Sequence, residues 1–211
     1  MTHIGMLLFP GLTQLDLTGP FEVLHRIPDA KVHLLWKTTD PVVADSGLGL
    51  VPSMAFADCP PLDVVFVPGG NGQLALMRDE VVLGFLRAHG ERARYVTSVC
   101  TGSLLLGAAG LLAGYRAATH WAFVDLLAAF GAIHAPGRVV VDRNRITGGG
   151  VTAGIDFALR LVAELAGEPA ARAIELGLEY NPTPPFHCGH PGLADPALVA
   201  QVRRRLRPEA G

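Results

Sequence analysis

Cysteine is scarce in this chain of 211 residues, which contains only Cys59, Cys100 and Cys188. These residues lie far apart in the sequence and are odd in number, so they do not form the framework of a disulfide-stapled domain. Unpaired thiols of this kind fit a reducing compartment. We therefore expect a cytoplasmic protein that is stabilised by its hydrophobic core.

Long apolar runs are also missing, since no segment approaches the ~20 apolar residues that a membrane helix requires. The first apolar run, at residues 4–9, follows no basic residue and ends at Pro10. We expect this run to be the first strand of the fold and not the core of a signal peptide. The sequence predicts no association with a membrane.

Positive charge is concentrated only at Arg203-Arg204-Arg205, and the formal net charge of the chain is −2. A protein that binds nucleic acid usually carries a basic patch or stripe on one face. We interpret the short arginine run as the solvated face of a helix. Nucleic acid is therefore not an expected partner.

Metal and nucleotide motifs are incomplete. The cluster His187-Cys188-Gly189-His190 contains metal-ligand residue types, but no second ligand pair has the spacing of a zinc site. The glycines at 148–150 lack the Lys-Ser/Thr ending of a phosphate loop and the spacing of a dinucleotide fold. The sequence thus predicts neither a bound metal nor a cofactor.

Hydrophobic residues, in contrast, make up 50% of the chain, enough for one globular domain over residues 1–211. Strand-like runs alternate with amphipathic segments, a rhythm typical of a parallel sheet with helices on both faces. We expect strands at 4–9, 32–38, 64–67 and 95–99, with helices ending near residue 26 and at 79–92, 101–109 and 198–206. The predicted fold class is α/β.

Ligands bind beyond the carboxyl ends of the strands in such sheets. Several unusual sequence features follow the predicted strand ends, and we expect them to gather at one edge. These features are Asp16, Gly69-Gly70, Cys100-Thr101 and the glycines at 148–150.

Cys100 lies on the turn between a predicted strand and a predicted helix. The pattern Ser98-x-Cys100-x-Gly102 has the small residues that a nucleophile elbow needs for its tight turn. A helix N-terminus favours the thiolate, which is the nucleophilic form of cysteine. A buried cysteine can equally be a small hydrophobic residue, and the segment alone leaves both interpretations open. Cys59, in a loop before Pro60, and Cys188 are weaker candidates.

Asp16 also has two interpretations. It could cap a helix, as could Thr18, with Pro20 in the first turn. Alternatively, its apolar neighbours Leu15 and Leu17 indicate burial, which would keep the carboxyl protonated as a general acid. The sequence does not decide between these roles.

The glycines after the 64–67 strand could leave backbone N–H groups free to approach a ligand. Together with the N–H of Thr101, the N–H groups of Gly69 and Gly70 could stabilise developing negative charge. A plain turn would explain both glycines as well. The Thr101 hydroxyl could orient a water, or Thr101 could merely start its helix.

His120 lies about twenty residues after the cysteine and could be the imidazole of a Cys-His dyad. We favour a structural histidine at a helix start. Gly150 belongs to a predicted strand-to-helix turn that lines the cleft, and both residues are secondary candidates for the site.

Taken together, these motifs resemble the ThiJ/PfpI superfamily, whose class I glutamine-amidotransferase-like fold is of the flavodoxin type. The resemblance covers nearly the whole chain. It rests on Leu8-Phe-Pro-Gly11, Asp16-Leu-Thr-Gly-Pro-Phe21, Val67-Pro-Gly-Gly70, Val99-Cys-Thr-Gly-Ser103, Ala118-Thr-His-Trp121, Thr147-Gly-Gly-Gly-Val-Thr-Ala-Gly-Ile-Asp156 and Tyr180-Asn-Pro-Thr-Pro-Pro-Phe186.

Within this superfamily the chain is most similar to the isonitrile hydratases, cytoplasmic hydro-lyases that convert an isonitrile and water to an N-substituted formamide. The resemblance implies a homodimer with a small-molecule isonitrile substrate. It also implies Cys100 as nucleophile, Asp16 as its acidic partner and Thr101 as the hydroxyl that helps to place water. Cys100 would form a thioimidate with the isonitrile carbon while Asp16 supplies the proton.

Two related groups give alternative functions. Peptidases and glyoxalase-like members carry a histidine directly after the nucleophile, where this chain has Thr101, so their activities are disfavoured. AraC-type regulators share the motifs in their ligand-sensing N-terminal domains but continue into a DNA-binding domain, which we do not expect after the helix at 198–206. A ligand- or redox-sensing protein and a Cys-dependent hydrolase or lyase with a Cys100-His120 dyad remain the alternatives.

Overall fold

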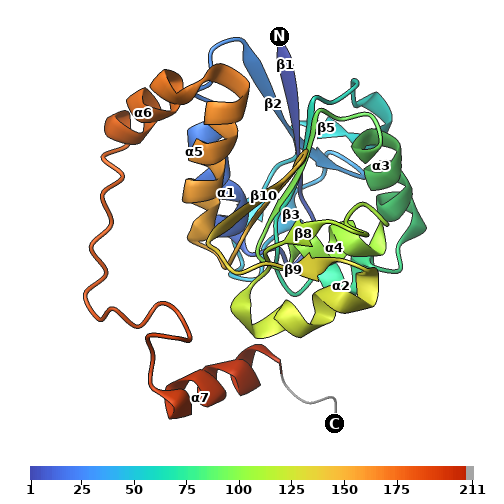
Figure 1. Cartoon of the computed structure of the whole chain (residues 1–211). Coiled ribbons are helices and arrows are strands. Elements are labelled where there is room, and N and C mark those ends of the chain that lie inside the picture. The colour runs from blue at the N-terminus through green and yellow to red at the C-terminus, as the bar shows by residue number, and fades with distance from the viewer. Residues whose placement is uncertain (208–211) are drawn as a thin grey trace.

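The computed structural model of the protein describes residues 1–207 and is built around a seven-stranded sheet (Figure 1). The strand order is β10-β11-β7-β6-β1-β2-β5, and every pairing is parallel except that of β10 with β11. The strands of this sheet are β1 (Thr2–Leu7), β2 (Ala30–Trp36), β5 (Met54–Ala55), β6 (Val64–Val67), β7 (Tyr95–Val99), β10 (Val139–Asp142) and β11 (Arg145–Gly148). The predicted α/β class with a mostly parallel sheet is confirmed.

Helices cover both faces of the sheet, with α1, α5 and α6 on one side and α3 and α4 on the other (Figure 1). The central strand β6 is consequently buried along its whole length, as its unbroken Val-Val-Phe-Val sequence requires. The helices are α1 (Gln14–Leu24), α2 (Gln73–Leu76), α3 (Glu80–Gly90), α4 (Gly102–Ala108), α5 (Ala153–Ala166), α6 (Glu168–Gly177) and α7 (Pro196–Leu206), with 3₁₀ segments η1 (Phe56–Asp58) and η2 (Trp121–Phe130).

Two small sheets complete the described elements. One pairs β3 (Val42–Val43) with β4 (Gly49–Leu50), and the other pairs β8 (Arg116–Ala117) with β9 (Ile133–His134). Across residues 1–207, no helix is both long and apolar enough to cross a membrane. The predicted domain over 1–211 includes residues 208–211, which lie outside the described residues, and it stays a prediction.

The first helix differs from its predicted position. Helix α1 begins at Gln14, so Pro20 lies in the helix interior and not in the first turn. The reason is the preceding loop, because the backbone N–H of Thr13 donates to the Gly69 carbonyl at 3.0 Å and fixes the chain direction before the helix starts. The first strand, predicted at 4–9, is likewise two residues earlier at Thr2–Leu7, although Phe9 remains fully buried.

Four neighbouring strands, β11, β7, β6 and β1, point their carboxyl ends to one edge of the sheet. The loops after them carry all the features that the sequence singled out at strand ends. The resulting edge is where a ligand site is expected in a fold of this kind.

Candidate active site

Cys100 stands on a strained turn directly after β7. Its φ is +57°, in the left-handed region that residues with a Cβ rarely adopt. The turn is held on both sides: the Cys100 N–H donates to the Gly148 and Gly149 carbonyls, and the Cys100 carbonyl accepts from the hydroxyls of Ser103 and Thr119. The predicted nucleophile elbow therefore has the expected backbone geometry.

The Cys100 thiol is almost completely enclosed, with 6% of the residue exposed. Burial raises its pKa well above the usual range, and the nearby Asp16 charge raises it further. The backbone N–H groups of Val151 and Thr101 hydrogen-bond the sulfur and act in the opposite direction. The sequence suggested a thiolate at a helix N-terminus, but burial outweighs that effect and the resting group is a thiol.

Asp16 lies in the first turn of α1, is fully buried and faces Cys100. Burial raises the pKa of this carboxyl to about 7, while the Gly69 N–H and the Cys100 thiol lower it. Its Oδ2 accepts from the Gly69 N–H at 2.9 Å, and within residues 1–207 the buried Oδ1 has no hydrogen-bond partner. An oxygen without a partner beside a thiol is well placed to exchange a proton.

The capping interpretation of Asp16 is wrong. The residue at the N-cap position of α1 is Thr13, and the Asp16 side chain is bonded across the sheet edge to Gly69 instead. Thr18 does not cap the helix either, because its hydroxyl donates to Gln14 Oε1 at 2.8 Å. Neither Asp16 nor Thr18 therefore has the capping role that the local sequence allowed.

Gly69 is the point at which the acid and the elbow meet. A Cβ at this position would lie 2.7 Å from each of three atoms: Asp16 Oδ2, Thr101 N and Thr101 Oγ1. Contacts this short do not occur for a real Cβ, so only glycine permits the approach of α1 to α4 here. The gathering of Asp16, Gly69, Cys100 and Thr101 agrees with the sequence prediction.

The N–H groups of the two glycines are not free, in contrast to the expectation that they face developing charge on a ligand. The Gly69 N–H is bonded to Asp16, and the Gly70 N–H donates to Thr101 Oγ1 at 3.1 Å. They orient the acid and the hydroxyl. Because Thr101 Oγ1 accepts from Gly70, its own proton remains available to a water or a substrate.

His120 and Gly150 lie together, and within residues 1–207 neither forms a hydrogen bond with the Cys100 thiol. The His120 ring caps η2, since its Nδ1 accepts from the Ala122 N–H at 3.2 Å, and burial lowers the pKa of the imidazole. A Cβ on Gly150 would lie 2.7 Å from the ring, so these two residues pack tightly. Within the described part of the chain no hydrogen bond connects His120 to Cys100, which matches the structural histidine and not the dyad.

Sequence reasoning missed two contributors to the elbow. Val151, with φ +25°, donates its N–H to the Cys100 sulfur, and Thr119 donates its hydroxyl to the Cys100 carbonyl at 3.1 Å. The glycines at 148–150, directly before Val151 and a predicted helix, were the sequence signal that could have indicated the role of Val151. Thr119 lies in the motif Ala118-Thr-His-Trp121, which contributed to the resemblance but gave this residue no role.

The remaining cysteines lie outside the site. Cys59 donates to the Pro60 carbonyl, and burial raises its pKa to about 11, whereas Cys188 is exposed. For residues 1–207, no group of three or more His, Cys, Asp or Glu side chains is arranged to hold a metal ion.

Comparison with known proteins identifies a family and two kinds of relative. The profile of the DJ-1/PfpI family matches residues 2–164. Isonitrile hydratase from Pseudomonas putida is 57% identical over 98% of this chain and 90% of its own. The HTH-type transcriptional regulator GbdR from Pseudomonas aeruginosa is 34% identical over 81% of this chain, which spans only 48% of that regulator.

Solved structures of related proteins have the same fold as this chain. A THiJ/PfpI family protein from Pseudomonas syringae has a TM-score of 0.95 at 47% identity, covering 97% of this chain and 86% of its own. Drosophila melanogaster DJ-1beta has a TM-score of 0.76 at 24% identity, covering 84% of this chain and 97% of its own, a similarity of fold alone.

We predict that Gly69→Ala destabilises the protein by about 1–3 kcal/mol, because the added methyl group has to displace Asp16 or Thr101. Urea denaturation measures the loss. Gly84→Ala is the matched control, since a Cβ there meets nothing within 4 Å on helix α3 and alanine favours a helix. Equal stability of the two variants would contradict the crowding at Gly69.

We predict that Asp16→Asn becomes progressively more stable than the wild type as the pH rises. With a pKa raised from 3.8 to about 7, the folded state holds a proton that the unfolded state has lost between these values. The free energy of unfolding of the wild type therefore falls as the pH rises from about 4 to about 7, by about 4 kcal/mol at most. The Asp16→Asn variant, whose amide does not titrate, shows no such fall. Denaturant curves at pH 4 and pH 8 test this, with exposed Asp58→Asn as control; parallel pH profiles for wild type and Asp16→Asn would refute the raised pKa.

Proposed function

The chain belongs to the DJ-1/PfpI family, and we propose that it hydrates isonitriles to N-substituted formamides. The observation that carries the proposal is the buried pair of Cys100 and Asp16, in a chain 57% identical to an isonitrile hydratase over almost its full length. The predicted family is confirmed, and the predicted hydro-lyase activity is supported by this identity. The roles of individual residues are part of the proposal.

The chemistry of the substrate explains why a thiol and a carboxyl are needed together. The terminal carbon of an isonitrile accepts a nucleophile and then needs a proton on that same carbon. Cys100 supplies the nucleophile, and Asp16, in the first turn of α1, receives and returns the proton. Because the resting pair is a thiol beside a carboxylate with a pKa near 7, one proton serves both steps.

In the first stage, the Asp16 carboxylate takes the thiol proton as the sulfur attacks the terminal carbon. The new S–C bond leaves a lone pair on that carbon, which the Asp16 carboxyl then protonates. The product is a thioimidate, R–N=CH–S–Cys100. The N–H groups of Val151 and Thr101 hydrogen-bond the sulfur and stabilise the negative charge that develops on it.

In the second stage, water adds to the thioimidate carbon. The Thr101 hydroxyl orients the water, and the carboxylate of Asp16 removes one water proton and passes it to the substrate nitrogen, which restores the carboxylate. Collapse of the resulting tetrahedral carbon breaks the C–S bond, forms the formamide C=O and returns a proton to Cys100. The sum is the addition of one water to one isonitrile.

The two alternative functions make different demands on the same site. A ligand or redox sensor related to regulators such as GbdR requires the Cys100 elbow but no turnover. A Cys-His hydrolase or lyase requires contact between Cys100 and His120, whereas the His120 Nδ1 is engaged with Ala122. Formamide release from a simple isonitrile such as cyclohexyl isocyanide separates the hydratase from the sensor.

We also propose that the protein works in the cytoplasm as a homodimer. Its three unpaired cysteines suit a reducing compartment. The homodimer is supported by exposed apolar side chains, including Leu176 and Phe186, that a partner would cover.

We predict that Cys100→Ala and Asp16→Asn abolish isonitrile hydration while the fold is retained, because each removes one half of the pair. Thr101→Val should lower kcat about 10- to 100-fold, since it removes only the hydroxyl that places water. Product formation by purified variants measures these effects. His120→Ala should retain turnover, and substantial hydration by Cys100→Ala or Asp16→Asn would refute the scheme.

We predict that kcat/KM rises with pH through about 7 and then levels off. Below this value Asp16 is protonated and cannot accept the thiol proton, whereas above it the pair holds the single proton that the reaction needs. Initial rates between pH 5 and pH 9 at low isonitrile concentration measure the profile. A rate that falls through pH 7 would show that the protonated carboxyl is the active form at the start of the reaction.

A further inference from the structure

The segment after α6 leaves the domain as an arm, which we define as residues 181–195. It runs along the outside of the molecule from the end of α6 to α7, at the opposite end of the domain (Figure 1). Residues 181–190 are all exposed, and Phe186 and Leu193 are 82% and 72% exposed. Helix α7 has no buried residue either.

Both ends of the arm are attached to its own domain. At its start, the Tyr180 hydroxyl donates to Asp156 Oδ1 on α5 at 3.0 Å. Beyond its end, Arg207 donates to Asp125 Oδ1 on η2 at 2.7 Å, and the Arg203 guanidinium lies 5.2 Å from the centre of the Trp121 ring. The path of the arm is therefore fixed at each end.

Between these ends, within residues 1–207, no backbone hydrogen bond connects residues 182–195 to the body of the domain. The backbone hydrogen bonds of residues 182–195 join only residues within that stretch or lead into α7. Ordering each residue costs about 1–2 kcal/mol of conformational entropy, which contacts elsewhere have to offset. Prolines at 182, 184, 185 and 191 reduce this cost by keeping the unfolded segment extended. An extended, proline-rich segment with large apolar side chains is suited to lie on another surface.

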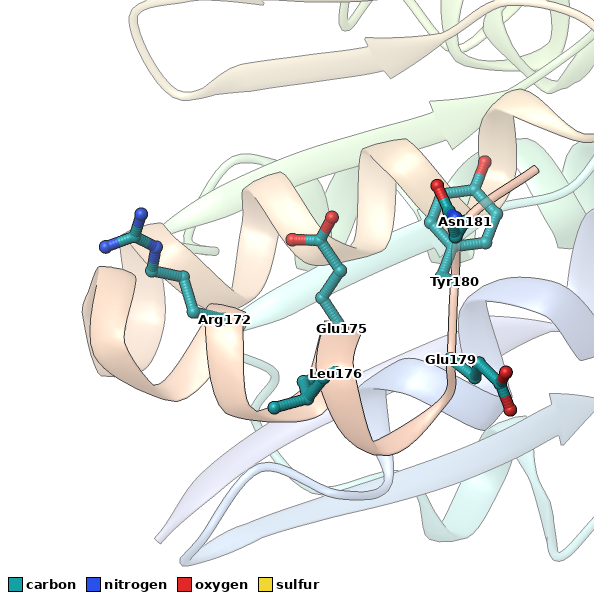
Figure 2. Close-up of a pocket in the computed structure, with 6 residues that line it drawn as sticks. All are labelled: Arg172, Glu175, Leu176, Glu179, Tyr180 and Asn181. Atoms are coloured by element: carbon teal, nitrogen blue, oxygen red, sulfur yellow. The ribbon is translucent and has the colours of Figure 1, made fainter. Parts of the chain in front are cut away.

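The same chain offers such a surface beside the base of the arm. One hollow of about 430 Å³ is lined by Arg172, Glu175, Leu176, Glu179, Tyr180 and Asn181 (Figure 2). A second, of about 360 Å³, is lined by α1 residues together with Ile155, Leu178 and Tyr180. Because Tyr180 lines both, we treat them as one groove between α1, α5 and α6.

The groove is acidic, and the basic residues of the C-terminal segment follow the arm. Three carboxylates, Glu22, Glu175 and Glu179, line the groove against the single guanidinium of Arg172. Residues 181–207 contain one acidic residue, Asp195, and four arginines. The four arginines lie on α7 or directly after it, whereas the arm itself carries no lysine or arginine. The arm therefore matches the apolar part of the groove, through Phe186 and Leu193.

We propose that the arm of one copy lies in the groove of a second copy, with Phe186 in the apolar part of the groove. The inference rests on the homodimer proposed above. A two-fold symmetric pair uses two such contacts, each copy supplying one arm and one groove. Of the arm, only its first residue, Asn181, lines the groove of its own copy, and from there the arm runs along the outside of the domain to α7 (Figure 1).

Cross-linking tests the contact in the full chain, since the native Cys188 already lies in the arm. Leu176→Cys, and separately Glu179→Cys, place a second thiol on the groove, and mild oxidation followed by non-reducing electrophoresis detects disulfides. We expect covalent dimers as the main product. Val81→Cys on α3, on the other side of the sheet, is the matched control and should give mostly monomers, as should Leu176→Cys combined with Cys188→Ser.

A second variant tests the energetics. Phe186→Asp should raise the dissociation constant of the dimer about tenfold or more in sedimentation measurements, without loss of folding, because the side chain is exposed within one copy. Leu48→Asp on the β3–β4 hairpin is the control and should not change it.

The outcomes separate this inference from the proposals it builds on. A dimeric wild type that yields only intramolecular disulfides, or none above the Val81→Cys level, overturns the arm contact and leaves the homodimer intact. A monomeric wild type at micromolar concentration overturns both. Isonitrile hydration measured on the same samples reports separately on the activity.

Discussion

The contact between the Cys100 thiol and the Asp16 carboxyl is the constraint on which the site depends. Both groups are buried, so the ionised form of either is costly, and burial raises the pKa of each. A second negative charge in this space is more costly still, which is why the pair keeps one proton over a wide pH range. A site of this kind suits a reaction in which a single proton moves from the nucleophile to the substrate.

Such a pair can exist only because the backbone around it has no side chains in the way. Gly69 allows the carboxylate and the Thr101 backbone to converge, and Gly102 brings α4 against the end of β6, where a Cβ would lie 2.2 Å from the Val67 carbonyl. The strained φ of Cys100 is held in place by four hydrogen bonds to its N–H and carbonyl. Rigidity of the elbow thus comes from two backbone carbonyls at the end of β11 and from the hydroxyls of Ser103 and Thr119, and the Cys100 side chain is left for chemistry.

Much of this arrangement is predictable from the sequence, because parallel strands of buried residues bring their carboxyl ends to one edge. Asp16, Gly69, Cys100 and Thr101 each follow such a strand, and the structure unites them. Local sequence patterns could not predict which group each polar group would contact or how deeply it would be buried. The Gly69 N–H binds Asp16, Thr13 takes the N-cap position and burial outweighs the helix dipole at Cys100, and each of these depends on contacts between segments far apart in the chain.

Helix α1 connects the chemistry to the outer surface of the molecule. Asp16 faces the sheet edge, whereas Leu15, Thr18 and Glu22, which recur at helical spacing, line the groove on the outer side. Asp16 itself lies on this helix and contacts the thiol from within its own chain. A copy that occupies the groove rests on the helix that positions the acid, and any shift of α1 would be felt at Oδ2 of Asp16, where Gly69 leaves no spare room.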